Sequence, residues 1–226
     1  MKLTQAVKDG FHRKQSILAI LVDFKAAYDN VWRHMLLHEL KKHGAAGNLL
    51  NWVQSFLSQR NIRCRFINAT SAWKLLLQGL GQGVDLSCLL FNIMIDDLET
   101  AIEKVPGISF LFFADDVVIW ATGSNIHSLE DTLKSFLLNL ATWVNINKIE
   151  VSVEKTVSQL FTLSTTQRLF HLEYKVLPLK QVPLYKYLGI NLDSKLHWGI
   201  AETSESPEVV NCYQLGRYPG CFIHSL

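Results

Sequence analysis

The chain has 226 residues, of which 49% are hydrophobic and 19% are charged, and its formal net charge is +2. This composition supports one sizeable core or two small ones and excludes a disordered protein. With so small a net charge, any affinity for nucleic acid must come from local basic patches. The four cysteines are scattered without a Cys-x-x-Cys pair. That pattern argues against a zinc site or a disulfide framework and favours a reducing compartment.

The sequence lacks the marks of secretion and of membrane insertion. Residues 1–5 hold no apolar signal-peptide core, and no stretch of about 18 uncharged apolar residues occurs. We therefore expect a soluble protein that is not secreted, binds no membrane and resides in the nucleus or the cytoplasm.

The apolar residues recur with helical spacing in some segments and alternate or run continuously in others. Helices and strands mix without strict alternation, which indicates an α+β fold with an antiparallel sheet covered by helices on one face. In chain order we predict a loop or short helix (1–16), a strand (17–22), two helices separated at Gly44, a hairpin (61–77), a glycine-rich loop (79–83), a helix (85–98), a hairpin around 115–116, a long helix (126–144), a strand through 160–161, a hairpin (177–192) and a poorly packed tail (199–226).

Polar residues before two of the helices predict where these helices begin. Asp29 or Asn30 is expected to cap the helix that Gly44 ends, and Asp85 or Ser87 is expected to cap the helix over 85–98.

Three aspartates stand where apolar runs end. Asp23 directly follows the strand at 17–22, and Asp115 and Asp116 interrupt the apolar run at 110–120. An ordinary turn is one interpretation of the pair, because aspartate caps turn backbone. If the two runs lie side by side, however, the three carboxylates repel one another unless cations are bound, and Mg²⁺ is the usual occupant. Two metal ions serve in-line phosphoryl transfer, which leaves polymerase and nuclease both open.

Five short motifs, in this order, resemble those of the reverse transcriptases of non-LTR, Jockey-like retrotransposons. Residues 21–32 resemble motif A, residues 79–92 resemble motif B, and Phe-Ala-Asp-Asp at 113–116 matches motif C. Residues 154–156 resemble motif D, and residues 187–193 resemble motif E. Each motif alone is a weak signal, but the five in the family's order select the polymerase over the nuclease.

The resemblance implies a partial reverse transcriptase domain over residues 1–198, followed by a divergent tail over 199–226. The implied fold is a right-hand polymerase palm with partial fingers and without a thumb. The implied activity is RNA-directed DNA synthesis, in which dNTPs are added to a DNA primer on an RNA template by two-metal nucleotidyl transfer. The cofactors would be two Mg²⁺ ions, for which Mn²⁺ can substitute.

The resemblance also assigns roles to individual residues. It implies that three aspartates bind the metal ions, that a lysine protonates the leaving pyrophosphate, and that an aromatic side chain collides with the 2′-hydroxyl of ribonucleotides. A backbone N–H would lie close to the triphosphate, and a Gln-Gly pair would contact the nucleotide and the templating base. The lysine is equally well explained as a surface residue, and the aromatic side chain as part of the core. The three aspartates are Asp23, Asp115 and Asp116, and the lysine is Lys155. The aromatic side chain is that of Tyr28, the backbone N–H is that of Phe24, and the Gln-Gly pair is Gln82 with Gly83.

The sequence departs from the family in motif B, where Gly81 and Cys88 replace two prolines and Asp85 adds a negative charge. Because proline fixes φ, Gly81 is expected to loosen the loop that orients Gln82. The family's upstream fingers motifs, its thumb and its endonuclease domain are not found. We therefore expect a truncated copy with weak or no polymerase activity in isolation, since lost positioning contacts cost large factors in rate.

Two alternatives to the polymerase remain. The first is a non-catalytic nucleic-acid-binding remnant, which would use Lys41, Lys42, Arg63 and Arg65. Arg63 and Arg65 share one side of their predicted strand, and a solvated face is the simpler explanation of both. The second is a metal-dependent nuclease, which uses the same carboxylates but needs no nucleotide-gating aromatic such as Tyr28.

Overall fold

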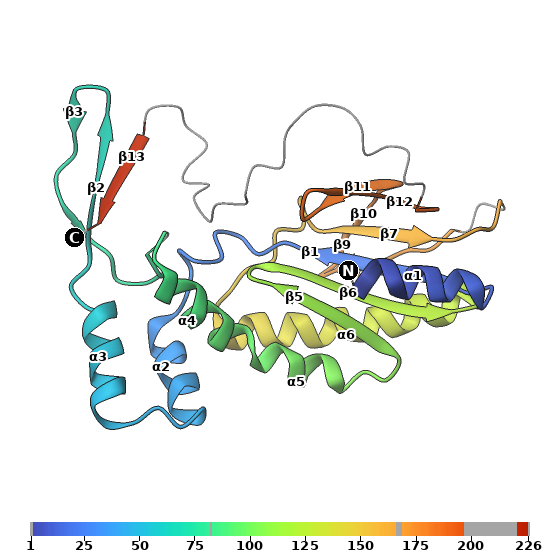
Figure 1. Ribbon diagram of the computed structural model, residues 1–226, viewed down its shortest axis with the longest axis horizontal. Helices are drawn as coiled ribbons and strands as arrows, with labels where there is room; N and C mark the ends of the chain where they lie inside the picture. Colours follow the sequence, from blue (N-terminus) through green and yellow to red (C-terminus); the bar gives the residue numbers. More distant parts are fainter. Residues whose placement is uncertain (1, 82, 166–168, 197–220, 226) are drawn as a thin grey trace. The chain divides into compact units, whose positions relative to one another are not determined.

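The computed structural model describes residues 2–81, 83–165, 169–196 and 221–225 (Figure 1). The chain divides into two compact units. The first unit comprises Met1–Lys25, Asp97–Ile146 and Glu150–Ser204, and the second comprises Ala26–Asp96, Asn147–Ile149 and Glu205–Leu226. Within the described ranges, no helix combines the length and the apolar character needed to cross a membrane.

The first unit is built on a five-stranded sheet. All neighbouring strands pair antiparallel except β10 and β7, which are parallel. Every residue of β1 is buried, which confirms the predicted central strand and follows from its uninterrupted apolar sequence. The strand order is β10 (Lys180–Gln181), β7 (Val157–Phe161), β1 (Ser16–Val22), β6 (Asp116–Gly123) and β5 (Ile108–Phe113).

One face of this sheet is covered by α1 (Lys2–His12). Leu3 and Val7 of α1 are buried in a cluster with Ile17 of β1 and Trp120 of β6. The hairpin of β11 (Leu184–Tyr187) and β12 (Ile190–Asp193) adds Tyr187 and Leu192 to the same cluster. The N-terminal segment is therefore a helix that packs on the sheet, because its apolar residues recur with helical spacing.

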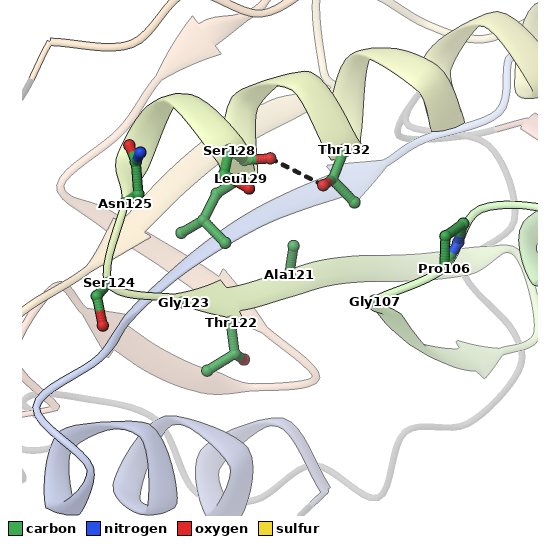
Figure 2. A pocket seen from close by; sticks show the side chains of 10 residues that line it. All are labelled: Pro106, Gly107, Ala121, Thr122, Gly123, Ser124, Asn125, Ser128, Leu129 and Thr132. Atoms are coloured by element: carbon green, nitrogen blue, oxygen red, sulfur yellow. Dashed lines mark hydrogen bonds between the residues drawn. The ribbon is translucent and has the colours of Figure 1, made fainter.

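The opposite face is covered by α6 (Ile126–Asn147). A Cβ at Gly123 would lie 3.1 Å from Leu129 of α6. Figure 2 shows Ala121 and Leu129 on one side of β6 and Thr122 pointing to the other. The α+β prediction is confirmed, whereas the expectation that helices cover only one face does not hold. The apolar residues that recur with helical spacing over 126–144 predict a buried stripe on the long helix. In α6 this stripe is buried at Leu129, Leu133, Phe136, Leu137, Leu140, Trp143 and Val144.

The remaining elements of the first unit are short. They are α5 (Asp97–Glu103), β8 (Glu173–Tyr174) and β9 (Leu177–Pro178). The hairpin predicted over 177–192 is shorter than expected, because residues 177–178 belong to β9, which pairs with β8. Its turn is at Leu188 and Gly189, which both have positive φ. The buried Gln159 holds the β11–β12 hairpin by donating from Nε2 to the carbonyls of Pro183 and Leu192.

The described residues of the second unit form three helices and a small sheet. Strand β2 pairs antiparallel with β3, β4 and β13. The pairing of β2 with β4 confirms the hairpin predicted over 61–77. The elements are α2 (Arg33–Lys42), α3 (Gly47–Leu57), β2 (Asn61–Phe66), β3 (Ala69–Thr70), β4 (Lys74–Leu75), α4 (Asp85–Ile95) and β13 (Cys221–Ser225).

Three local predictions in this unit are wrong. The N-caps of α2 and α4 are Trp32 and Val84, which make no side-chain capping hydrogen bond, in place of the predicted polar residues. Residues before α2 stay non-helical because the carbonyls of Tyr28 and Val31 accept hydrogen bonds from the loop at residues 79–80. The apolar spacing over 85–98 also predicts that Leu89 lies in the core, but this residue is 56% exposed.

The predicted tail over 199–226 lies mostly outside the described residues. Cys221–Ser225 form β13, whose register runs from Cys221 opposite Phe66 to Ser225 opposite Ile62. The division of the chain at residue 198 stays a prediction.

We predict that Gly10→Ala destabilises the protein although alanine favours helices. A Cβ at position 10 would collide with Cδ1 of Ile17, which is fully buried. Overpacking costs about 1–3 kcal/mol, and the gain in helix propensity is about 1 kcal/mol, so we expect a net loss of about 0–2 kcal/mol in urea unfolding. The exposed Gln5 on the same helix gives the control, since Gln5→Ala should change the unfolding free energy by less than about 0.5 kcal/mol. A Gly10→Ala protein more stable than the unchanged chain would show that Ile17 yields without cost.

Candidate functional site

The pairing of β1 with β6 brings the predicted acidic residues together. Val22 is opposite Val117, so the next pair in this antiparallel register is Asp23 and Asp116. Asp115 lies in the two-residue loop between β5 and β6, where Phe113 pairs with Asp116. The structure therefore places all three aspartates at one end of the neighbouring strands β1 and β6 in the sheet of the first unit.

The loop that carries Asp115 has a strained backbone. Ala114 has a φ of 52°, in the left-handed region that side chains with a Cβ disfavour. Two-residue hairpin loops need positive φ because the twist of the flanking strands demands it. The short loop holds Asp115 in an exposed position directly beside the half-buried Asp116.

Burial and neighbouring negative charge raise the pKa of Asp23 and of Asp116. Burial raises the pKa of Asp116, and the negative charges of Asp115 and then Asp23 raise it further. Burial is also the largest cause of the raised pKa of Asp23. Lys155 and a hydrogen bond from Ser152 lower this pKa in part, and the charge of Asp115 raises it. The Oδ1 atom of Asp23 is buried without a hydrogen-bond partner among the described residues. The site thus carries negative charge that the described part of the chain compensates only in part.

The turn around residues 152–156 holds Asp23 from the other side. The Asp23 N–H donates to Oγ1 of Thr156 (3.1 Å), and the Ser152 N–H donates to the Asp23 carbonyl (2.8 Å). Within the turn, the N–H groups of Lys155 and Thr156 donate to the Ser152 carbonyl. This turn places Nζ of Lys155 3.9 Å from Oδ1 of Asp23, with the lysine side chain mostly exposed.

Phe24 is fixed by its backbone and by its ring. It forms an isolated antiparallel bridge with Val151, and its ring centroid lies 6.0 Å from that of Trp143. The hydrogen bonds around this bridge use the N–H groups of Lys25 and Ser152. No hydrogen bond of the described residues uses the Phe24 N–H, so this donor is available to a ligand.

The donor atoms of this site suit a hard cation. Carboxylate oxygens are the ligands that Mg²⁺ prefers, and the buried Oδ1 of Asp23 lacks a hydrogen-bond donor. At the same time, the described residues contain no group of three or more His, Cys, Asp or Glu side chains arranged to hold a metal ion. The chemistry of the aspartates therefore fits a divalent cation, whereas their side chains are not in a ligating arrangement.

The other predicted residues belong to the second unit or are not described. The ring of Tyr28 stacks on Phe91 of α4 with centroids 4.7 Å apart, and the Tyr28 carbonyl accepts from the Leu80 N–H. Gly83 is exposed and has a φ of 80°, which explains why glycine suits this position. Gln82 lies outside the described residues.

Two groups of residues beside the aspartates had no role predicted from the sequence. Ser152 and Thr156 had no assigned role, although Thr156 stands inside motif D. Tyr185 and Tyr187 of β11 lie within electrostatic reach, because burial and then Asp116 raise their pKa, that of Tyr187 to about 12. Only the pairing of distant segments reveals either group.

A cavity of about 540 Å³ opens at the far end of β6 (Figure 2). Since β6 begins with Asp116 and the cavity is lined by its last residues, the two are separated by most of the strand. None of the predicted site residues contributes to the cavity, which is lined by Pro106, Gly107, Ala121, Thr122, Gly123, Ser124, Asn125, Ser128, Leu129 and Thr132.

Comparison with known proteins identifies relatives of this chain. Residues 1–192 match the family described as reverse transcriptase (RNA-dependent DNA polymerase). A probable RNA-directed DNA polymerase from transposon BS of Drosophila melanogaster is 28% identical over 203 residues, which is 88% of this chain and 22% of the relative. The polymerase from the mobile element jockey of the same organism is 24% identical, over 83% of this chain and 21% of the relative. The chain thus spans about a fifth of the length of these relatives.

Solved structures show the same fold in telomerases. The apo telomerase of Candida tropicalis, truncated from its C-terminal domain, matches 85% of this chain and 38% of its own with a TM-score of 0.53 and 17% identity. Telomerase of Candida albicans, in complex with a fragment of telomeric RNA, matches 79% of this chain and 32% of its own with a TM-score of 0.51 and 13% identity. The family match over residues 1–192, the five motifs and this fold agree: the chain belongs to the reverse transcriptase family and is related to the enzymes of non-LTR retrotransposons.

Proposed function

We propose that this chain carries the catalytic carboxylates of an RNA-directed DNA polymerase of a non-LTR retrotransposon. Such an enzyme adds dNTPs to a DNA primer on an RNA template. The observation that carries the proposal is the register of β1 and β6, which puts Asp23 opposite Asp116 and next to Asp115. On this proposal the sheet of the first unit is the polymerase palm, and the second unit contributes part of the fingers.

The three aspartates would hold two Mg²⁺ ions, or Mn²⁺ in their place. Bound in this way, the ions would stabilise the attacking and leaving oxygens during phosphoryl transfer. The repulsion that adds to burial in raising the pKa of Asp23 and Asp116 supports this assignment, because cations relieve it.

Lys155 and Phe24 would act on the phosphates. The ion pair of Lys155 with Asp23 keeps a proton donor at the edge of the acidic cluster, where a leaving pyrophosphate needs one. The Phe24 N–H, which no hydrogen bond of the described residues uses, would donate to the triphosphate.

Tyr28 would restrict the sugar, and Gln82 with Gly83 would contact the nucleotide and the templating base. Stacking on Phe91 fixes the plane of the Tyr28 ring, which a steric gate requires. The hydrogen bond from the Leu80 N–H to the Tyr28 carbonyl (2.8 Å) joins the gate residue to the loop that precedes Gln82.

A primer-extension assay tests the proposal. With an RNA template, a DNA primer, dNTPs and protein in excess, we expect at most weak Mg²⁺-dependent addition of nucleotides, and Asp115→Asn should abolish it, since the metal ions lose a charged ligand. Exposed Asp131 of α6 provides the control, because Asp131→Asn removes the same charge away from the cluster. Extension that survives in Asp115→Asn would contradict the assignment, and robust extension that this change abolishes would contradict the weak activity expected of this chain.

The same assay separates the alternatives. Arg63, whose guanidinium lies 4.5 Å from the centroid of Trp73, offers a pairing of charge and ring that suits nucleic-acid binding without catalysis. Salt-dependent RNA binding without extension, unaffected by Asp115→Asn, would favour that function. Cleavage of the template in the absence of dNTPs would favour a nuclease.

We predict that Asp116→Asn stabilises the metal-free protein. Burial and then the charges of Asp115 and Asp23 raise the folded-state pKa of Asp116 above its ordinary value of 3.8. Ionisation of Asp116 therefore costs stability, and this cost develops as the pH rises from the ordinary value through the raised pKa. In EDTA at pH 7 we expect the Tm of the variant to rise by about 2–4 °C, which corresponds to about 1 kcal/mol in a chain of this size.

Mg²⁺ supplies the complementary measurement. It should raise the Tm of the unchanged protein and not that of Asp116→Asn, because a ligand stabilises only the folded state that binds it. Equal Tm values for both proteins in EDTA, with no response to Mg²⁺, would show that the carboxylates are too far apart to interact.

We further predict that Tyr28→Val increases the use of ribonucleotides. Removing the ring opens the space for a 2′-hydroxyl, so the ratio of rNTP to dNTP incorporation in single-nucleotide extension should rise about tenfold or more, as a lost steric collision allows. Tyr28→Phe keeps the ring and should leave the ratio unchanged. The same increase in Tyr28→Phe would mean that the hydroxyl, and not the ring, controls the sugar.

A further inference from the structure

Two arginines of the second unit lie close together without a carboxylate partner. Arg60 directly precedes β2 and is only 9% exposed, and Arg33 begins α2. Their charges repel, since Arg60 contributes, after burial, to lowering the pKa of Arg33. Neither forms a salt bridge with any described residue.

The two arginines use their nitrogen atoms differently. Arg33 donates from Nε to the Gly79 carbonyl (2.9 Å), from NH1 to the Leu76 carbonyl (2.9 Å) and from NH2 to the Gln78 carbonyl (3.1 Å). These bonds fix the segment at residues 76–79, while the Leu76 N–H donates to the Arg60 carbonyl. Arg33 therefore acts chiefly as a clamp on this segment.

Arg60 has no such partners. Its guanidinium carbon lies 4.9 Å from the ring centroid of Phe56, and no described residue accepts a hydrogen bond from it. Its Nε is buried, and a buried donor left without an acceptor costs about 1–3 kcal/mol. A guanidinium held in this way binds planar or tetrahedral oxyanions through its fork of N–H groups.

Gly81 makes room for the Arg60 head group. A Cβ at position 81 would lie 2.6 Å from NH2 and 2.9 Å from Cζ of Arg60. Any side chain at this position would therefore displace the guanidinium. The φ of Gly81 is not in the left-handed region that favours glycine. The close approach of Arg60 is therefore the structural reason for a glycine at position 81.

We propose that Arg60, next to Arg33 and seated over Gly81, binds a phosphate group. The phosphate belongs to a nucleic-acid strand or to a nucleotide triphosphate, and this choice of ligand rests on the proposed function. Two adjacent positive charges without a counter-charge among the described residues suit a multiply charged oxyanion better than a single carboxylate. The hydrogen bonds of Arg33 and the stack on Phe56 keep the site in place before the ligand arrives.

Two variants test the site by different means. Arg60→Met removes the charge and keeps an apolar side chain of similar length. Gly81→Ala keeps every charge and pushes the guanidinium aside, which should hardly affect Tm because the displaced atoms end a flexible side chain. Gly123→Ala, whose Cβ would meet only the apolar Leu129, is the matched glycine control, and Lys104→Met, on an exposed lysine of the first unit, is the charge control.

Binding is measured in EDTA by fluorescence anisotropy, with a short labelled single-stranded RNA and, as competitor, dTTP. We expect about tenfold weaker binding in Arg60→Met and in Gly81→Ala, because a hydrogen bond to a charged group is lost. For RNA, the slope of log K against log salt between about 50 and 200 mM should fall by about 0.7 in Arg60→Met, the value for one phosphate contact on a single strand. Both controls should bind normally.

The two probes distinguish the source of the phosphate. If only the affinity for RNA falls, Arg60 binds a phosphodiester of the strand. If only the affinity for dTTP falls, Arg60 binds the triphosphate. Unchanged binding of both probes in either variant with a normal Tm, or no binding by the unchanged protein, overturns the proposal. Because binding is measured in EDTA, it does not depend on metal ions at the aspartates. Failure of primer extension therefore does not contradict phosphate binding at Arg60, and failure of phosphate binding does not contradict the assignment of the aspartates.

Discussion

The antiparallel pairing of β1 with β6 is the interaction on which the first unit depends. Its register is set by two apolar segments that must each be buried, because a slip by one residue would turn every side chain to the other face. The same register puts Asp23 beside Asp116 at one end of these two strands. The carboxylates thus meet as a consequence of burying Ile17 to Val22, and no attraction between the acidic residues is needed.

Bringing these negative charges together is energetically unfavourable, and the surrounding residues hold the aspartates in place against this repulsion. Burial and repulsion raise the pKa of Asp23 and Asp116, and the loop beside them contains Ala114 at a positive φ. The turn at residues 152–156 restrains Asp23 through its backbone and brings Lys155 to 3.9 Å from its carboxylate. Such concentration of strain and unfavourable charge is typical of functional sites. In the second unit the charges are reversed: Arg60 is held between Phe56 and Gly81 without an anionic partner among the described residues.

Gly81 shows how the structure changes the meaning of a sequence difference. From the sequence, a glycine in place of the proline usual in motif B predicts a looser loop. In the structure, the segment before it is fixed by three hydrogen bonds from Arg33, and the missing Cβ leaves the space that the Arg60 guanidinium occupies. The glycine can therefore serve a steric purpose that no spacing rule detects.

The sequence alone determined the family, the strand at 17–22, the acidic hairpin and the stripe of α6, because these follow from local periodicity and short motifs. It did not predict the N-caps of α2 and α4, where Trp32 and Val84 replace the expected polar residues. Nor did it predict that helices cover both faces of the sheet. Those features depend on contacts between distant segments, such as the bonds from residues 79–80 to Tyr28 and Val31. Only the tertiary structure decided which aspartates meet and that the buried Nε of Arg60 lacks a hydrogen-bond partner among the described residues, since burial and electrostatics act across space and not along the chain.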